Sequence, residues 1–329
     1  MKVLITGGFG MVGCCIKDFQ VSASKILNLL KNSDTLDFYY LSSQDCDLRD
    51  RDAVLKFFAL HNFEGLIHLA ANVGGLYKNM NQGIEMFSDN VKINENVLEG
   101  AHLSGIQRAV FVLSSCIYPA QPSRFPMDES MIHESPPHPS NEGYAYAKRM
   151  LELQCRQYSK KHGREYICAI PVNLYGPYDN FKVGDSHMIP GLMERFHRGK
   201  KLNQKEKFVA YGTGKPLRQF LYARDFAEIL CRLLLADECK KEMKSGNIIC
   251  CNDEYTVQEV VEKLGEAMGI SREDILFDAS RSDGCMKKTV SNDKFRALFP
   301  DFEFTDFSTG LKETYEWFQI AEAEGKVRI

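Results

Sequence analysis

The amino-acid sequence predicts an α/β fold built on a doubly wound parallel sheet, with a smaller α/β lobe attached. Two observations support this fold class. Short apolar runs alternate with longer amphipathic stretches through the first 170 residues, an order typical of parallel strands linked by right-handed helical crossovers. A glycine-rich turn at residues 7–13 follows the first run and opens the first helix.

The periodicity of each segment sets the expected elements. We expect strands at residues 2–6, 38–41, 66–69, 109–113 and 166–170, and helices at 11–19, 52–60, 84–103 and 144–158. After about residue 176 the alternation breaks down, and a further helix is expected at 257–268. We therefore assign residues 1–175 to the sheet domain, with parts of about 220–252 returning to it, and residues 176–329 mainly to the smaller lobe. A long loop is expected at 123–141.

Composition excludes several classes of protein. The formal net charge of −3 over 329 residues gives no general attraction to nucleic acid or to an anionic membrane. No apolar run approaches the ~18 to 20 residues of a membrane span, and no secretory pattern opens the chain. The eleven cysteines are odd in number and contain no C-x-x-C pair. They indicate neither a disulfide framework nor a metal site, and they suit a reducing, cytoplasmic compartment.

The glycine-rich turn reads Gly7-Gly8-Phe9-Gly10-Met11-Val12-Gly13. Its position between a strand and a helix is that of the Rossmann dinucleotide fingerprint. Gly7 would permit the tight turn, and Gly10 would let the backbone approach a diphosphate at the helix N-terminus beside Met11 and Val12. Gly13 would allow close packing of helix on sheet. A ligand-free glycine turn is the alternative, and a Walker-type loop is excluded because no Gly-Lys-Ser/Thr follows.

The segment after the second strand bears on the choice of cofactor. Its end, Leu41-Ser-Ser-Gln44, lacks the carboxylate that would bind the ribose 2′-hydroxyl of NAD, so the sequence favours NADP. No Arg or Lys stands immediately beside it. Asp47 and Leu48 could contact adenine, although Asp47 could instead cap the following helix. Ala70 and Ala71 would let the cofactor lie against the end of the third strand, unless they serve close packing alone.

Tyr144 and Lys148 are spaced so that they share one face of a helix. A nearby ammonium favours the phenolate, so we expect Lys148 to lower the pKa of Tyr144 and to reach the cofactor ribose. Ser114 ends the fourth strand, at the sheet edge where ligands bind in open α/β folds. The Tyr and Ser side chains could therefore act on a substrate carbonyl. A surface pair with no catalytic role is the alternative.

Longer motifs resemble one family. The glycine turn, Ser114 and Tyr144/Lys148 are similar to those of the extended short-chain dehydrogenase/reductase superfamily. The stretches 113–119, 173–180 and 186–190 resemble, within it, the GDP-L-fucose synthases. That resemblance implies a cytoplasmic, metal-free homodimer joined through helices 84–103 and 144–158. It also implies an NADP(H)-dependent enzyme that epimerises C3 and C5 of GDP-4-keto-6-deoxy-D-mannose and then reduces C4.

The resemblance also implies roles for single residues. Cys116 would be the base and His187 the acid of epimerisation, since a thiol and an imidazole can act from opposite faces of the sugar. Tyr144 would protonate the C4 oxygen, with Ser114, or alternatively Ser115, holding that oxygen. Substrate phosphates would meet Arg195, Arg218 and Lys288. Further cofactor contacts would come from Pro171, Asn173, Leu174 and His187.

One departure and two alternatives remain open. Phe9 stands where bacterial relatives have a basic residue, which leaves the contact to a 2′-phosphate unidentified. The same fold could serve another nucleotide-sugar epimerase or dehydratase, for which the Cys116/His187 pair is not needed. A non-catalytic dinucleotide sensor is a third reading, although such a protein would commonly lose Tyr144 or Lys148.

Overall fold

A six-stranded parallel sheet forms the centre of the computed structural model, which describes residues 1–21, 36–202, 208–235, 246–281 and 283–328. The strands lie in the order β2-β1-β3-β4-β5-β9, which confirms the predicted fold class. Their bounds are β1 Lys2–Thr6, β2 Asp37–Leu41, β3 Gly65–His68, β4 Arg108–Val112, β5 Glu165–Pro171 and β9 Asn247–Cys250. The four residues of β3 are all buried, as expected for a strand covered on both faces.

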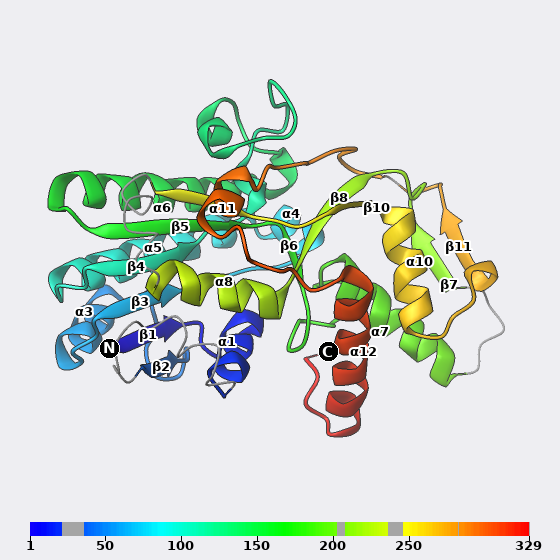
Figure 1. The fold of residues 1–329 in the computed structure, drawn as a ribbon, viewed down its shortest axis with the longest axis horizontal. Coiled ribbons are helices and arrows are strands. Elements are labelled where there is room, and N and C mark those ends of the chain that lie inside the picture. The colour runs from blue at the N-terminus through cyan, green and yellow to red at the C-terminus, as the bar shows by residue number, and fades with distance from the viewer. Residues whose placement is uncertain (22–35, 203–207, 236–245, 282, 329) are drawn as a thin grey trace.

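Helices cover both faces of this sheet (Figure 1). On one face α5 packs between α3 and α6, and on the other α1 packs against α8. The bounds of these helices are α1 Met11–Val21, α3 Arg51–Leu60, α5 Gly83–Leu103, α6 Glu142–His162 and α8 Ala223–Leu235. Apolar side chains of both layers and the sheet form one continuous core. This packing fixes the strand ends relative to one another, and the site lies at those ends.

The local signals located these elements closely. Strand β1 matches its expected bounds, and the other expected strands of the sheet differ by one residue at either end. Helix α6 runs further than expected, to a left-handed Gly163 at φ 66° after a basic last turn, which is a favourable helix end. Asp50, and not Asp47, caps α3, because Asp50 accepts from the backbone N–H of Ala53. Asp47 is therefore free of the capping role.

The smaller lobe has its own core of apolar residues and lies beyond the carboxyl ends of the large sheet (Figure 1). A three-stranded sheet, in the order β10-β8-β6, connects it to the large sheet, and β7 pairs with β11. The strands are β6 Asn173–Tyr175, β7 Phe208–Tyr211, β8 Leu217–Tyr222, β10 Glu254–Thr256 and β11 Ile275–Asp278. The helices are α4 Leu76–Asn81, α7 Met188–Lys201, α10 Val257–Ala267, α11 Asp293–Leu298 and α12 Phe307–Ala323.

Segments that are late in the chain return to the large sheet. Strand β9 pairs in parallel with β5, and Phe295 of α11 joins the large core. The expected loop at 123–141 contains short 3₁₀ turns at Glu129–His133 and Pro139–Asn141. It is held by backbone bonds from Met127 to Thr289 and from Ser291 to Met127. This loop is therefore an ordered wall beside the start of α6.

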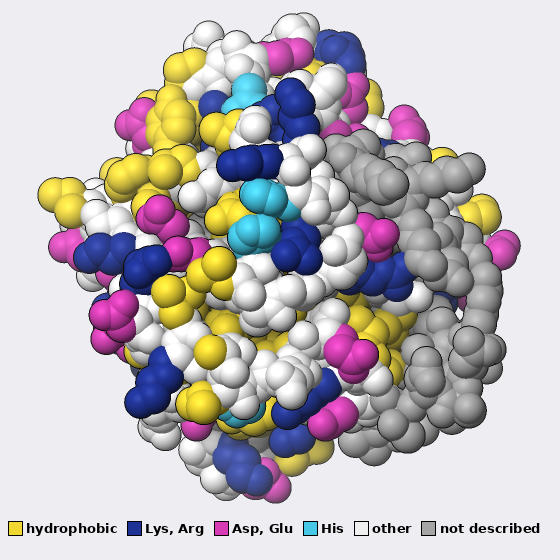
Figure 2. Space-filling view, turned by 90° about the vertical axis from the view of Figure 1, so that its left-hand side faces the viewer, with side chains coloured by type: hydrophobic (Ala, Val, Ile, Leu, Met, Phe, Trp, Pro, Cys, Tyr) yellow, Lys and Arg dark blue, Asp and Glu magenta, His cyan; other side chains and the backbone are white. Residues whose placement is uncertain are grey.

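The opposite end of the molecule differs from the site end. Figure 2 shows the side on which α6 ends and β5 begins, where positive, negative and hydrophobic side chains are interspersed. No single charge covers the visible part of that face. Within the described residues, the model contains no helix long and apolar enough to span a membrane.

Candidate active site

A cavity of about 1080 Å³ runs along the carboxyl ends of the strands. All fifteen residues predicted to bind the cofactor lie in its wall: Gly7, Gly10, Met11, Val12, Gly13, Asp47, Leu48, Ala70, Ala71, Tyr144, Lys148, Pro171, Asn173, Leu174 and His187. They come from five separate strand ends. The parallel sheet brings them together because each of its strands ends at the same edge.

The glycine turn forms a cradle that side chains would fill. Gly7 has φ 67°, and a Cβ there would lie 2.8 Å from the backbone nitrogen of Ala70. A Cβ on Gly13 would lie 2.5 Å from the carbonyl oxygen of Gly8. At Gly10 the only close neighbour is the Gly7 oxygen at 3.2 Å, so the space beside it is open to the cavity. This geometry fits the close approach of a dinucleotide diphosphate to the start of α1.

Tyr144 and Lys148 project from α6 as predicted, but their electrostatics differ from the prediction. The Lys148 Nζ lies 5.7 Å from the Tyr144 ring centroid and donates to the Val112 carbonyl oxygen at 2.7 Å. Burial lowers the pKa of Lys148 to about 8. Burial, with Cys116 nearby, raises the pKa of Tyr144 above its ordinary value. The expected lowering by Lys148 is wrong here, because desolvation of the phenolate outweighs the attraction of the ammonium.

The turn after β4 holds Ser114 and Cys116 together. The Ser114 side chain accepts from the backbone N–H of Cys116 at 3.3 Å and caps a 3₁₀ turn, Ser115–Ile117. Burial raises the pKa of the Cys116 thiol, although Ser114 and the charges of Lys288 and Lys148 oppose this. The expectation that nearby positive charge lowers this pKa is therefore wrong for the structure as a whole. Without a ligand the group is a thiol.

A second cavity of about 230 Å³ adjoins the first. Its wall includes Ser114, Ser115, Cys116, Tyr144 and His187. The structure thus brings together all the predicted catalytic residues except Lys148, which lines the large cavity behind Tyr144. Both serines face this space, so the alternative between them stays open.

His187 stands at the start of α7 and is positioned by the loop after β3. The backbone N–H of Gly75 donates to the Asp185 carbonyl at 3.0 Å. A Cβ on Gly75 would lie 2.7 Å from the Ser186 carbonyl oxygen, so only glycine allows this approach. The His187 ring is exposed to the cavity, yet the surrounding protein partly desolvates its charged form and lowers its pKa. The free imidazole is therefore neutral near pH 7.

The structure separates the three predicted phosphate ligands. Arg218 and Lys288 lie in the wall of the smaller cavity. Arg195 lies in the wall of neither cavity. It donates to the Val209 carbonyl at 2.7 Å, and its guanidinium stacks 4.7 Å from the ring centroid of Tyr211. Arg195 therefore faces the outer lobe, where it could meet only a more distant part of a ligand.

Arg49 is a residue of the site that sequence reasoning missed. It lies in the wall of the large cavity beside the residues after β2. Its Nε and Nη2 donate to the two carboxylate oxygens of Asp47, at 3.0 and 2.8 Å, and these bonds lower the pKa of Asp47 to about 2. Its Nη1 lies 3.8 Å from Asp89, beyond hydrogen-bond distance. Its position next to Asp47-Leu48 was the signal that could have identified it.

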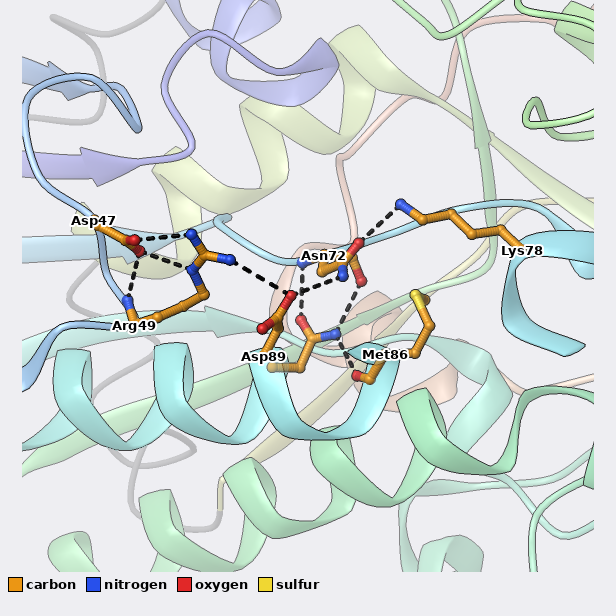
Figure 3. A network of polar contacts seen from close by, with 7 residues as sticks. Asp47, Arg49, Asn72, Lys78, Met86 and Asp89 are labelled. Atoms are coloured by element: carbon orange, nitrogen blue, oxygen red, sulfur yellow. Dashed lines mark hydrogen bonds and ion pairs between the residues drawn. The ribbon is translucent and has the colours of Figure 1, made fainter. Parts of the chain in front are cut away.

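The network around Arg49 reaches the substrate side of the cavity (Figure 3). Asp89 accepts from the Asn72 amide at 3.1 Å, and the Asn72 carbonyl accepts from Lys78 at 2.8 Å. Lys78 also donates to the Val73 carbonyl at 3.0 Å. These bonds hold the loop between β3 and α4, which forms part of both cavity walls. Within the described residues, no cluster of His, Cys, Asp and Glu could bind a metal.

Comparisons with known proteins agree with this geometry. The model of the NAD dependent epimerase/dehydratase family matches residues 3–248. The GDP-L-fucose synthase of Dictyostelium discoideum is 40% identical over 96% of this chain and 94% of its own length. That of Escherichia coli is 32% identical over 96% of both chains.

The chain belongs to the GDP-L-fucose synthase family.

A solved structure of this family has the same fold. The crystal structure of a GDP-L-fucose synthetase from Naegleria fowleri bound to NADP superposes with a TM-score of 0.87 at 34% identity, covering all of this chain and 96% of that one. Family membership confirms the resemblance found in the sequence. The roles of the single residues stay predictions.

Proposed function

We propose that this protein converts GDP-4-keto-6-deoxy-D-mannose to GDP-L-fucose as a 3,5-epimerase and NADPH-dependent 4-reductase. The observation that supports this most directly is the shared smaller cavity. It places Cys116 and His187, a possible base and acid, with the Ser114 and Tyr144 pair that suits carbonyl reduction. A plain reductase has no use for the first pair. The family relationship gives the substrate class.

Epimerisation would use the acidity that the C4 ketone confers on the C3 and C5 protons. The Cys116 thiolate removes one proton and becomes a thiol, and protonated His187 returns a proton to the opposite face of the same carbon. Both side chains are neutral in the free protein, because burial disfavours their charged forms. Proton transfer that charges the pair must therefore accompany substrate binding.

Reduction would follow in the same place. Bound NADPH supplies the hydride for C4. Tyr144 donates its proton to the C4 oxygen, which Ser114 holds by a hydrogen bond. The raised pKa of Tyr144 keeps the phenol protonated and able to donate before reaction. Lys148, held against the Val112 carbonyl, supports the tyrosine from below and faces the cofactor cavity.

The charges of the two ligands would be met locally. Arg218 and Lys288 would bind the substrate diphosphate from the wall of the smaller cavity. At the adenosine end, we assign the NADP 2′-phosphate to Arg49, whose Nη1 donors are uncommitted and whose side chain is half-exposed. Its existing bonds to Asp47 would orient the guanidinium for that contact.

Product analysis tests this function. The protein is incubated with GDP-4-keto-6-deoxy-D-mannose and NADPH, and the product is identified by NMR while the nicotinamide absorbance is followed. We expect GDP-L-fucose with stoichiometric NADPH oxidation. A product that keeps the original configuration at C3 and C5 would show a plain reductase. Absence of any turnover with this substrate would favour the sensor reading.

We further propose a cytoplasmic homodimer formed through α5 and α6. These neighbouring helices expose large apolar side chains, among them Ile84 at 79%, Met150 at 39% and Leu153 at 43%. Such a patch is typical of a buried interface. Sedimentation at micromolar concentration should give twice the chain mass, and Leu153→Glu should give a monomer. A monomeric wild-type protein would contradict the proposal.

A further inference from the structure

Arg328 is a cation of the large cavity for which the proposed reaction has no role. Among the described Lys and Arg side chains, Arg49, Lys148 and Arg328 line that cavity. Lys148 lies beneath Tyr144 and Arg49 lies at the adenosine end. Arg328 comes from the segment after α12, more than 300 residues along the chain from the glycine turn, and lines the cavity with Met11 and Val12.

The segment that contains Arg328 is fastened to the site by its backbone. Its carbonyl oxygen accepts from the N–H of Phe181 at 2.9 Å, and it forms a parallel bridge with Asn180. The Arg328 Nη2 also donates to the Tyr178 carbonyl. Tyr178 in turn donates to Asp18 of α1 at 3.2 Å. These contacts hold the guanidinium in place against the first helix.

The charge of Arg328 acts on the first turns of α1. Burial raises the pKa of Cys14, one turn into that helix, and the charge of Arg328 is the main influence that opposes the rise. A cation beside a helix N-terminus is unfavourable, because the helix dipole is positive there. Asp179 is close enough for Arg328 to lower its pKa, yet no ion pair joins these two described residues, and burial raises that pKa to about 7. The cation is thus left without a full counter-ion.

An anion placed between Arg328 and the start of α1 would resolve this arrangement. Gly10 is open to the cavity at that point, and the first N–H groups of α1 face the same space. We propose that Arg328 binds the diphosphate of the dinucleotide, opposite the glycine turn. The inference rests on the proposed cofactor site and adds to it a ligand contributed by the far end of the chain. The diphosphate would then be held from two sides.

Equilibrium titration with NADPH and with NADH, followed by nicotinamide fluorescence, tests this assignment. Both nucleotides contain the diphosphate, whereas only NADPH has the 2′-phosphate. Arg328→Ala should raise the Kd of both by the same factor, about tenfold, and Arg328→Lys should restore part of the affinity. Arg49→Ala should weaken NADPH binding far more than NADH binding. Lys326→Ala is the matched control, because Lys326 lies in the same segment and pairs with Glu324.

The outcomes separate this inference from the proposed function. If Arg328→Ala binds both nucleotides as the wild type does, while its melting curve is unchanged, the diphosphate assignment is overturned. A loss restricted to NADPH would also overturn it, since that result places Arg328 at the 2′-phosphate. If the wild-type protein binds neither nucleotide, the proposed cofactor fails and the inference fails with it.

Discussion

Gly10 and Gly13 lie three residues apart in one turn, but alanine should affect them in different ways. A Cβ on Gly13 would lie 2.5, 2.6 and 2.7 Å from the oxygen, carbonyl carbon and Cα of Gly8. These are backbone atoms, so the helix must move away from the strand. A Cβ on Gly10 meets one atom, the Gly7 oxygen at 3.2 Å, and otherwise enters the cavity.

The two geometries set the expected magnitudes. Gly13→Ala should lower the free energy of unfolding by about 1–3 kcal/mol, the usual range for forced overpacking. Gly10→Ala should leave it nearly unchanged, within about 0.5 kcal/mol, because its backbone is not left-handed and the added methyl meets open space. Both variants should lose at least about tenfold in NADPH affinity, Gly10→Ala because its methyl occupies the place of the diphosphate.

Thermal unfolding with and without NADPH measures both quantities. The melting temperature without NADPH should fall for Gly13→Ala alone. Saturating NADPH raises the wild-type stability, by about 2.7 kcal/mol at 100 times the Kd, and this gain should shrink for both variants. Wild-type affinity in Gly10→Ala would refute the position given to the diphosphate. Equal melting temperatures for the two variants would refute the packing argument.

Three further predictions concern the catalytic groups. Lys148→Met should abolish reduction yet stabilise the protein near pH 7, because the folded state depresses the lysine pKa to about 8. The penalty of about 3 kcal/mol is partly offset by the lost bond to Val112, about 1 kcal/mol; the gain should fade as pH rises toward about 10.4, and constant stabilisation in pH-dependent melting would contradict it. Solvent deuterium uptake at C3 and C5 should rise with pH from about 7 to about 9, following the scarce thiolate of Cys116; a plateau below pH 8, or undiminished uptake in Cys116→Ser, would argue against this base. Gly75→Ala should shift the Ser186 carbonyl and with it His187, so deuterium uptake should slow while the NADPH Kd stays unchanged; equal uptake would show that Gly75 does not position the acid.

The sequence by itself determined the elements and the contents of the cofactor cavity. Strand and helix periods are local properties, and the glycine turn between β1 and α1 specifies its own geometry. The i, i+4 spacing of Tyr144 and Lys148 places them on one helical face. Because parallel strands end at one edge, every residue assigned to the cofactor from a strand end or the glycine turn reached the same cavity.

Only the tertiary structure decided the charges and the distant contributors. The pKa directions of Tyr144 and Cys116 depend on how deeply each group is buried, and burial reversed the direction expected from neighbouring charge. Arg195 proved to face the outer lobe. Arg328 reaches α1 through contacts between segments about 150 and 300 residues apart, which no local pattern records. Desolvation and long-range contact arise from the packed chain as a whole, and so they could be found only there.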